Sequence, residues 1–326
     1  MEMIRLSRRS FWFRLRRVGE RGGLRAARSV CAALLGFAGL LLPAHAVVFY
    51  WTADPTYNTT PPTGKLADSG WQWVGLWAGC QGTPIGPHHF LTARHIGGAV
   101  GDAIVFRGVS YATTAFFEDP ATDLRICEIG GTFPGWAPLY RTTNEVGRSL
   151  VVFGTGMGRG SEIMVHGLLR GWRWGEGRGT LRWGENVVVA AVDRGPPWGP
   201  ALRAIFDPAV GFNVAQLASG DSSGPVFIDD GAGWKLAGIA AFVDGLFNTT
   251  PEGSGFDAAI FDARGLYFGT EGAWHLAAGT QLVRSGFYAT RVSVRAAWID
   301  AIIHPVSHSG DLPTIAPPRP DATRSR

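Results

Sequence analysis

Short runs of apolar and β-branched residues alternate along the chain with breaks rich in Gly, Pro and Asp. Runs of this length at this spacing are typical of strands in barrels or sandwiches. One late segment, Val292 to Ile303, has helical spacing of its apolar residues. The pattern therefore predicts an all-β body closed by a C-terminal helix. The predicted strands are Trp71–Leu76, His89–Thr92, Ala103–Phe106, Leu124–Ile129, Leu150–Phe153, Asn186–Val192, Val226–Asp229 and Lys235–Val243.

The composition supports a folded, loop-rich protein. Of 326 residues, 46% are hydrophobic and 17% are charged, which is too apolar for a disordered chain. The 46 glycines interrupt the chain too often for a helical bundle. No repeat with a period of about 20 to 50 residues is visible, so neither a solenoid nor a propeller is expected.

The N-terminal segment has the pattern of an export signal. An Arg-rich stretch precedes an apolar run from Val30 to Leu42, and the small-x-small sequence Ala44-His45-Ala46 follows it. The apolar run is too short to cross a bilayer. We therefore expect residues 1–46 to be removed and the mature protein to be periplasmic or secreted, with no stable membrane insertion. The Pro-rich tail, 306–326, is expected to be disordered.

The charge distribution argues against nucleic acid as a partner. The whole chain has a net charge of +4, but residues 1–46 hold nine arginines and two glutamates. From Val47 onward there remain 21 basic and 24 acidic residues, a net charge of −3. Because the excess of positive charge lies in the leader, the mature protein lacks the basic character that nucleic-acid binding requires.

Cysteine usage leaves two possibilities open. Cys31 lies in the predicted leader, so Cys80 and Cys127 are the only cysteines of the mature chain. An exported protein with two cysteines can form one disulfide. Both residues also fit predicted strands, where two buried thiols are equally expected.

The segment from Gly220 to Pro225 reads Gly-Asp-Ser-Ser-Gly-Pro and places Ser222 in a glycine-flanked turn before a strand. Attack by a serine hydroxyl on a carbonyl produces an oxyanion, which needs two backbone N–H groups converging on one point. A glycine two positions before the serine allows the backbone to deliver one of them. The amides of Gly220 and Ser222 are therefore the predicted oxyanion hole.

A serine nucleophile also needs a histidine base and a carboxylate that orients the histidine. His95 follows an apolar strand in Leu91-Thr92-Ala93-Arg94-His95, and Asp123 opens the strand Leu124–Ile129. Asp119 is a second possible carboxylate, but the strand directly after Asp123 favours Asp123. The predicted catalytic residues are His95, Asp123 and Ser222.

These motifs resemble those of the trypsin-like (chymotrypsin-fold, S1-type) serine proteases, which have Leu-Thr-Ala-Ala-His, Asp-Ile-Ala-Leu and Gly-Asp-Ser-Gly-Gly-Pro in the same order. Cys80–Ile85, Lys235–Phe242 and Gly286–Ile303 resemble further landmarks of the family. The resemblance implies a domain over 47–305 with two six-stranded antiparallel β-barrels. These are barrel one at about 70–145 and barrel two at about 146–291, followed by a closing helix at about 292–303. It implies a serine endopeptidase that acts on proteins or peptides without a cofactor.

The resemblance also gives Asp221 a structural role, as a buried carboxylate that needs a cationic partner. In animal members of the family this partner is an N-terminus made by proteolysis, and no matching activation sequence is found here. We expect an internal arginine such as Arg159, and the alternative is the α-amino group of Val47 released by signal cleavage. Ser223 replaces a glycine and is expected to add a side chain near the leaving group.

Specificity can be predicted only from the resemblance. Gln216, six residues before Ser222, corresponds to the base of the substrate pocket, where an aspartate would select Lys or Arg. Ala241, Phe242 and Val243 correspond to its wall, and Val243 stands where a glycine keeps the entrance open. We therefore expect small or medium apolar residues at the cleaved position. The insertion 244–285 is expected to lie near the cleft and to restrict access.

Two other functions remain as alternatives. A trypsin-like protein without turnover would bind partners on the same barrels, and the insertion and Ser223 favour that possibility. A carbohydrate-binding β-sandwich would use some of the 13 tryptophans, for example those between Arg170 and Trp183. We interpret that stretch as a packed hairpin, and we interpret His88 and His89 as turn residues rather than metal ligands. No feature of the sequence specifies an oligomeric state.

Overall fold

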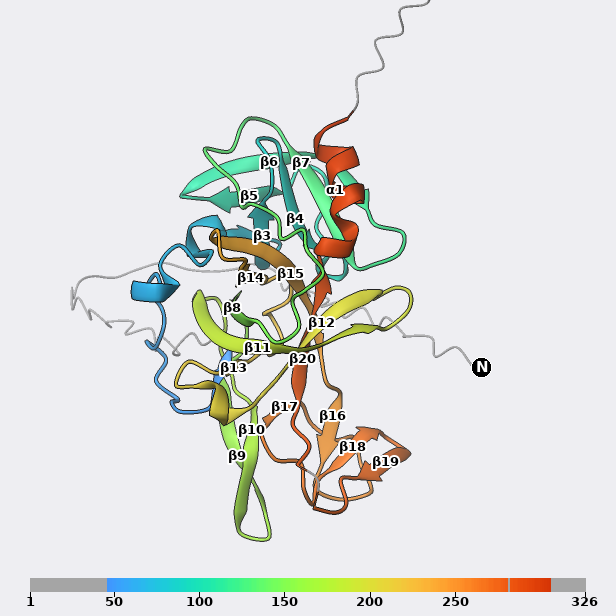
Figure 1. The fold of residues 1–326 in the computed structure, drawn as a ribbon. Coiled ribbons are helices and arrows are strands. Elements are labelled where there is room, and N and C mark those ends of the chain that lie inside the picture. The colour runs from blue at the N-terminus through green and yellow to red at the C-terminus, as the bar shows by residue number, and fades with distance from the viewer. Residues whose placement is uncertain (1–45, 281, 306–326) are drawn as a thin grey trace, which may run out of the picture. The chain divides into compact units, whose positions relative to one another are not determined.

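The computed structural model describes residues 46–280 and 282–305, so the predicted signal (1–46, except Ala46) and tail (306–326) lie outside the described residues. Two closed antiparallel barrels of six strands form the body (Figure 1). The predicted all-β class, with two six-stranded barrels and a C-terminal helix, is confirmed. The alternative of a β-sandwich is wrong, because the strands close on themselves rather than forming two open sheets.

The first barrel is closed in the order β2-β3-β4-β7-β6-β5. Its interior is filled by large side chains such as Trp77, Phe90 and Phe106, each at most 1% exposed. Its strands are β2 Gly75–Trp77, β3 Cys80–Pro84, β4 His89–Ala93, β5 Ala103–Phe106, β6 Val109–Glu118 and β7 Leu124–Ile129.

The second barrel is closed in the order β11-β12-β20-β15-β14-β8. Smaller side chains, including Val152, Val226 and Ala289, fill its interior. Its strands are β8 Ser149–Gly154, β11 Arg182–Asp193, β12 Pro200–Ile205, β14 Pro225–Asp229, β15 Trp234–Val243 and β20 Gly286–Arg291.

A third hydrophobic cluster joins the barrels and explains why several strands read as continuous apolar runs. Along β8, Leu150 and Val152 point into the second barrel, whereas Val151 and Phe153 pack toward the first. Successive strand side chains face opposite sides, so a strand between two cores must be apolar on both faces. Helix α1 (Ala296–Ile303) covers this cluster with Ile299, and Figure 1 shows it beside the first barrel.

Smaller sheets extend the second barrel. Strands β9 Arg159–Val165, β10 Leu168–Trp174 and β17 Ala258–Ile260 form one sheet, and β16 Leu246–Asn248, β18 Tyr267–Thr270 and β19 Ala273–Leu276 form another. The short strand β1 Val48–Phe49 pairs with β13 Ala215–Gln216. The 3-10 turns are Gly64–Leu66, Trp71–Trp73, Arg94–Ile96, Pro208–Val210 and Ser293–Arg295.

One predicted strand is corrected at its start. Residues Trp71–Trp73 form a 3-10 turn, and β2 begins only at Gly75. Gly70 has a φ of +123° and lies against the Phe227 ring, so the chain turns there instead of extending. The two tryptophans pack against the cluster between the barrels, which accounts for their apolar spacing.

Candidate active site

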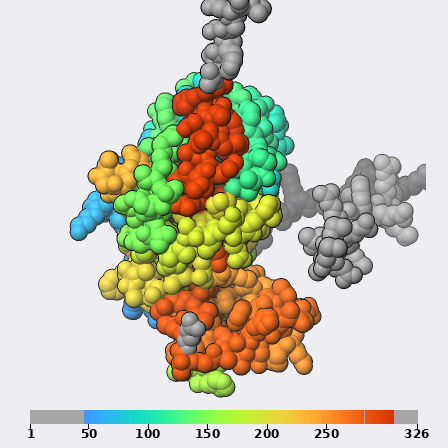
Figure 2. Space-filling view, turned by 45° about the vertical axis from the view of Figure 1, so that its right-hand side comes forward, coloured from blue at the N-terminus to red at the C-terminus, as the bar shows by residue number. Residues whose placement is uncertain are grey.

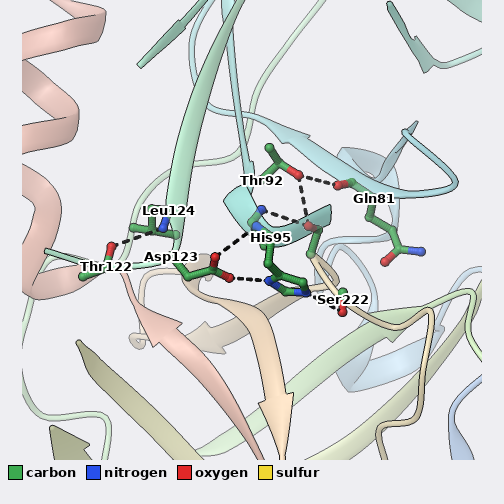
Figure 3. Close-up of polar contacts among 9 residues, drawn as sticks. Gln81, Thr92, His95, Thr122, Asp123, Leu124 and Ser222 are labelled. Carbon is green, nitrogen blue, oxygen red and sulfur yellow. Dashed lines mark hydrogen bonds and ion pairs between the residues drawn. The ribbon is translucent and has the colours of Figure 1, made fainter. Parts of the chain in front are cut away.

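Two neighbouring strands of the first barrel bring His95 and Asp123 together. β4 and β7 pair so that Ala93 lies opposite Leu124. His95 comes shortly after Ala93, and Asp123 comes directly before Leu124, so the two side chains lie at the same end of the strand pair. The His95 N–H donates to Asp123 Oδ1 at 3.0 Å, and His95 Nδ1 lies 2.5 Å from Asp123 Oδ2. Figure 3 shows the Asp123 carboxylate beside the imidazole ring.

Ser222 reaches the same point from the second barrel. It lies in the loop before β14, and its Oγ is 2.9 Å from His95 Nε2 (Figure 3). Asp123 is only 3% exposed, so its bond to Nδ1 is sheltered from water. A proton held on Nδ1 leaves the lone pair of Nε2 free to accept the Ser222 proton. The structure thus brings the three predicted residues into one hydrogen-bonded line.

Asp119, the alternative carboxylate, has a different set of contacts. Arg295, next to the C-terminal helix, donates to both of its carboxylate oxygens at 2.6 Å. The Thr122 hydroxyl donates to it as well, at 2.6 Å. Asp119 therefore holds the helix end against the loop that precedes Asp123 and does not contact His95.

The predicted oxyanion amides have no internal acceptor. Gly220 has a φ of +91°, a conformation that glycine adopts without strain. Within the described residues, neither the Gly220 N–H nor the Ser222 N–H donates to another group of the protein. Both donors therefore remain available for a ligand oxygen.

Ser223 does not point toward a leaving group as expected. Its side chain is fully buried, its Oγ accepts the Ala93 N–H at 2.9 Å, and it bonds to Thr92 Oγ1 at 3.0 Å. Its φ of +67° is unusual for a residue with a side chain. The serine that replaces glycine therefore ties the nucleophile loop of one barrel to the histidine strand of the other.

Asp221 is buried beside the nucleophile, and Arg159 is not its partner. The carboxylate accepts the N–H groups of Gly156 at 2.7 Å and Ala218 at 2.8 Å, and the backbone N–H of Val47 lies near enough to lower its pKa. Burial raises its pKa to about 7, although these N–H groups oppose the rise. Arg159 instead donates to the Tyr50 carbonyl and lies over the Trp172 ring, so the expectation for Arg159 is wrong.

The arginine whose charge reaches Asp221 is Arg182. It donates to the carbonyls of Ala46, Asp54 and Tyr57 and lies over Phe49, and burial lowers its pKa to about 10. These contacts hold the segment that starts at Ala46, whose first four residues are at most 1% exposed. The Val47 amide nitrogen, which cleavage after Ala46 would convert into the α-amino group expected as the alternative partner, lies near Asp221.

A cavity of about 380 Å³ opens next to Ser222. Ala241, Phe242 and Val243, the residues expected in the wall of a substrate pocket, are among its lining residues. Gln216 is not, because its side chain is 1% exposed and donates to Ser285 Oγ at 3.2 Å. The remaining lining residues are Trp174, Leu217, Ala218, Ser219, Asp221, Ala240, Asp244, Gly245, Leu246 and Asp257.

Trp198 is a site residue that the sequence did not indicate. It lies in the β11–β12 connection, its ring packs edge-on against His95 at 5.9 Å, and it also contacts Phe242 at 4.9 Å. Phe242 in turn stacks on Tyr288 at 4.5 Å. These rings form an aromatic surface beside the histidine. No motif surrounds Trp198, so no signal for it could be read from the sequence.

The described residues contain no candidate metal site. No three His, Cys, Asp or Glu side chains of this part gather closely enough to hold a metal ion. Cys80 and Cys127 are free thiols, and burial raises the pKa of Cys127 to about 12.

Trp172 is buried beneath Arg159, in agreement with a packed hairpin. None of the helices in 46–280 and 282–305 has the length and apolar character needed to cross a membrane.

Comparison with known proteins gives structural similarity only. No family model and no curated protein matches the sequence. A mutant of human heparin binding protein (CAP37) is 17% identical, with 72% of this chain and 93% of that chain covered and a TM-score of 0.44. Mouse neuropsin, a serine protease of the limbic system, is 14% identical, with 72% and 96% covered and a TM-score of 0.44. The Rv3671c protease of M. tuberculosis in its active form is 16% identical, with 69% and 73% covered and a TM-score of 0.39.

Proposed function

We propose that this chain, whose two barrels and terminal helix are those of the trypsin-like serine proteases, is an exported serine endopeptidase that cleaves proteins or peptides. The observation that carries the proposal is the hydrogen-bonded line from Asp123 through His95 to Ser222 Oγ. Two unoccupied backbone donors beside the serine support it. We assign the catalytic domain to residues 47–305, with residues 1–46 as an export signal cut after Ala46.

In the proposed reaction Ser222 Oγ attacks the scissile carbonyl carbon, and its proton moves to His95 Nε2. The carbonyl oxygen becomes an oxyanion that accepts the N–H groups of Gly220 and Ser222. The carbon–nitrogen bond then breaks, and His95 gives its proton to the departing amine. Water hydrolyses the resulting ester by the same steps, with His95 again as the base. Asp123 keeps the ring oriented and stabilises the imidazolium.

The proposed test is active-site labelling of the chain that begins at Val47. A fluorophosphonate probe should label the protein once, and Ser222→Ala should abolish the labelling. Casein digestion should be lost in the same variant. Ser110→Ala is a matched control, because Ser110 is an exposed serine of the first barrel that lies outside the cavity and has no contact to His95. A folded protein that is neither labelled nor active on casein would contradict the proposal and favour the silent binding protein.

A further inference from the structure

The cavity beside Ser222 is largely apolar but is lined by three carboxylates. Two of them are satisfied within the protein. Asp221 accepts backbone N–H groups, and Asp244 accepts Arg203 at 2.9 Å and the Tyr288 hydroxyl at 2.8 Å. An ion pair and a hydrogen bond of this kind leave Asp244 little capacity to attract a further cation.

The third carboxylate, Asp257, is different. Among the described residues no Lys, Arg or His nitrogen lies within 4.0 Å of its carboxylate, and no N–H or O–H donates to it. Partial burial alone raises its pKa, and no neighbouring charge opposes this rise. Because Asp257 is exposed at the cavity wall, its carboxylate is free to pair with a cation that enters the cavity.

The insertion 244–285 fixes the position of Asp257. Asp257 is exposed between Phe256 and Ala258, whose side chains are buried in a cluster that the insertion forms with β9. β17 pairs with β10, and the Trp174 N–H donates to the Asp257 carbonyl at 3.3 Å. Figure 2 shows the insertion (orange) at the opposite end of the molecule from helix α1 (red). Backbone pairing thus holds Asp257 at the cavity wall.

We propose that the cavity selects a lysine or arginine side chain at the cleaved position and that Asp257 is the residue that selects it. This rests on the proposed peptidase function. The aliphatic stem of such a side chain would lie along Leu217, Ala241 and Val243, and its cationic end would meet Asp257. Trp174, which lines the same wall, offers an aromatic face for the cation.

The proposal replaces the specificity expected from the sequence. That expectation assumed that Gln216 forms the pocket base, whereas Gln216 is buried against Ser285 and does not line the cavity. The negative charge at the cavity comes instead from Asp257 in the insertion 244–285, which none of the family motifs covers. A neutral apolar side chain would fill the same volume but would leave Asp257 unpaired.

The kinetic test compares peptides that differ only at the residue before the cleaved bond, with lysine or its uncharged analogue norleucine. We expect kcat/KM to favour lysine by about tenfold to a hundredfold, as for hydrogen bonds to charged groups. Asp257→Asn should reduce this ratio to about one, and Glu252→Gln should leave it unchanged. Glu252 is an exposed carboxylate of the same insertion outside the cavity. A preference for norleucine, or a ratio unaffected by Asp257→Asn, would overturn the proposal.

A binding test separates this proposal from catalysis. In the Ser222→Ala protein, titration calorimetry compares benzamidine, an aromatic cation, with benzamide, its neutral analogue. Benzamidine should bind at least about tenfold more tightly, and Asp257→Asn should remove the difference. Equal binding would overturn the proposal even if Ser222 is labelled. A benzamidine preference that depends on Asp257 would support the pocket even if labelling fails and the peptidase function is rejected.

Discussion

The loop that carries Ser222 separates two regions that differ in how their polar groups are satisfied. Toward the first barrel, His95, Asp123 and Ser223 are held by hydrogen bonds within the protein. Toward the insertion, the carboxylate of Asp257 has no partner among the described residues. Under the proposed function the first region is preorganised for the reaction, whereas the second holds an exposed carboxylate that a ligand can pair. Variants of the first should therefore affect all substrates equally, and variants of the second should change the choice of substrate.

The largest effect is expected for Asp123→Asn. The amide cannot accept the Nδ1 proton as the carboxylate does, so the imidazole adopts the wrong tautomer, and kcat should fall by about 10⁴-fold. Steady-state kinetics on the lysine and norleucine peptides would measure this loss. The ratio between the two substrates should not change, and a changed ratio would break the distinction between the regions.

A smaller loss is expected when Val47 is not the chain end. A chain that begins Gly-Ser-Ala46-Val47 offers Asp221 an amide, whereas a chain that begins at Val47 offers a charged amine. Leaving a buried carboxylate without its cation should slow labelling of Ser222 by about a hundredfold. Fluorophosphonate labelling rates of the two chains test this. Equal rates would show that the amide and Arg182 suffice.

The same two chains should differ in how pH affects stability. In the extended chain the pKa of Asp221 is raised from 3.8 to about 7 on folding, so the folded state holds a proton that the unfolded state releases. Its free energy of unfolding should therefore decline, relative to the chain beginning at Val47, as pH rises from about 4 to about 7. Urea unfolding of both chains across this range measures the difference. Parallel pH profiles would contradict the prediction.

In the pocket region, Val243→Ala should change specificity by about fivefold to tenfold. Val243 lines the cavity at the end of β15, and a shorter side chain widens the space beside it. The expected result is a higher kcat/KM for aromatic residues relative to alanine at the cleaved position, measured with matched peptides. Labelling of Ser222 should be unchanged, and an equal effect on all substrates would place Val243 in the catalytic region instead.

The smallest effect on activity is expected for Ser223. Ser223→Ala leaves the buried Ala93 N–H without an acceptor and should cost about 1–3 kcal/mol in the free energy of unfolding. Ser223→Gly loses the same bond but relieves the positive φ, so it should be about 1 kcal/mol more stable than Ser223→Ala. Urea unfolding separates the two. If the glycine variant were the less stable, strain at this residue would be excluded.

The strands and the turn at Ser222 could be predicted because their determinants are local, whereas the two barrels and the grouping of His95, Asp123 and Ser222 were expected from the family resemblance. A strand buried on both faces is recognised by its apolar run, and a glycine-flanked serine by its turn. Asp257 could not be predicted in this way. Its place depends on the pairing of β17 with β10, which joins segments far apart in the chain, and no short motif specifies it.

The failure with Arg159 has a related physical cause. Charge alone suggested an arginine near Asp221, but the direction of a long side chain depends on what surrounds it. Arg159 lies over Trp172, and Arg182 is the arginine enclosed near the carboxylate. The same applies to Trp71 and Trp73, whose spacing suggested a strand although they pack between the barrels from a 3-10 turn.

The enclosed position of Val47 has a consequence for where the protein could act. Val47 is fully buried with a φ of +42°, a conformation that a β-branched residue adopts only under strain. Cutting the bond before it removes that torsional restriction and creates a cation next to Asp221 in one event. Under the proposed maturation, the uncut protein inside the cell would have little activity. Removal of the export signal would activate it, and no second proteolytic cut would be needed.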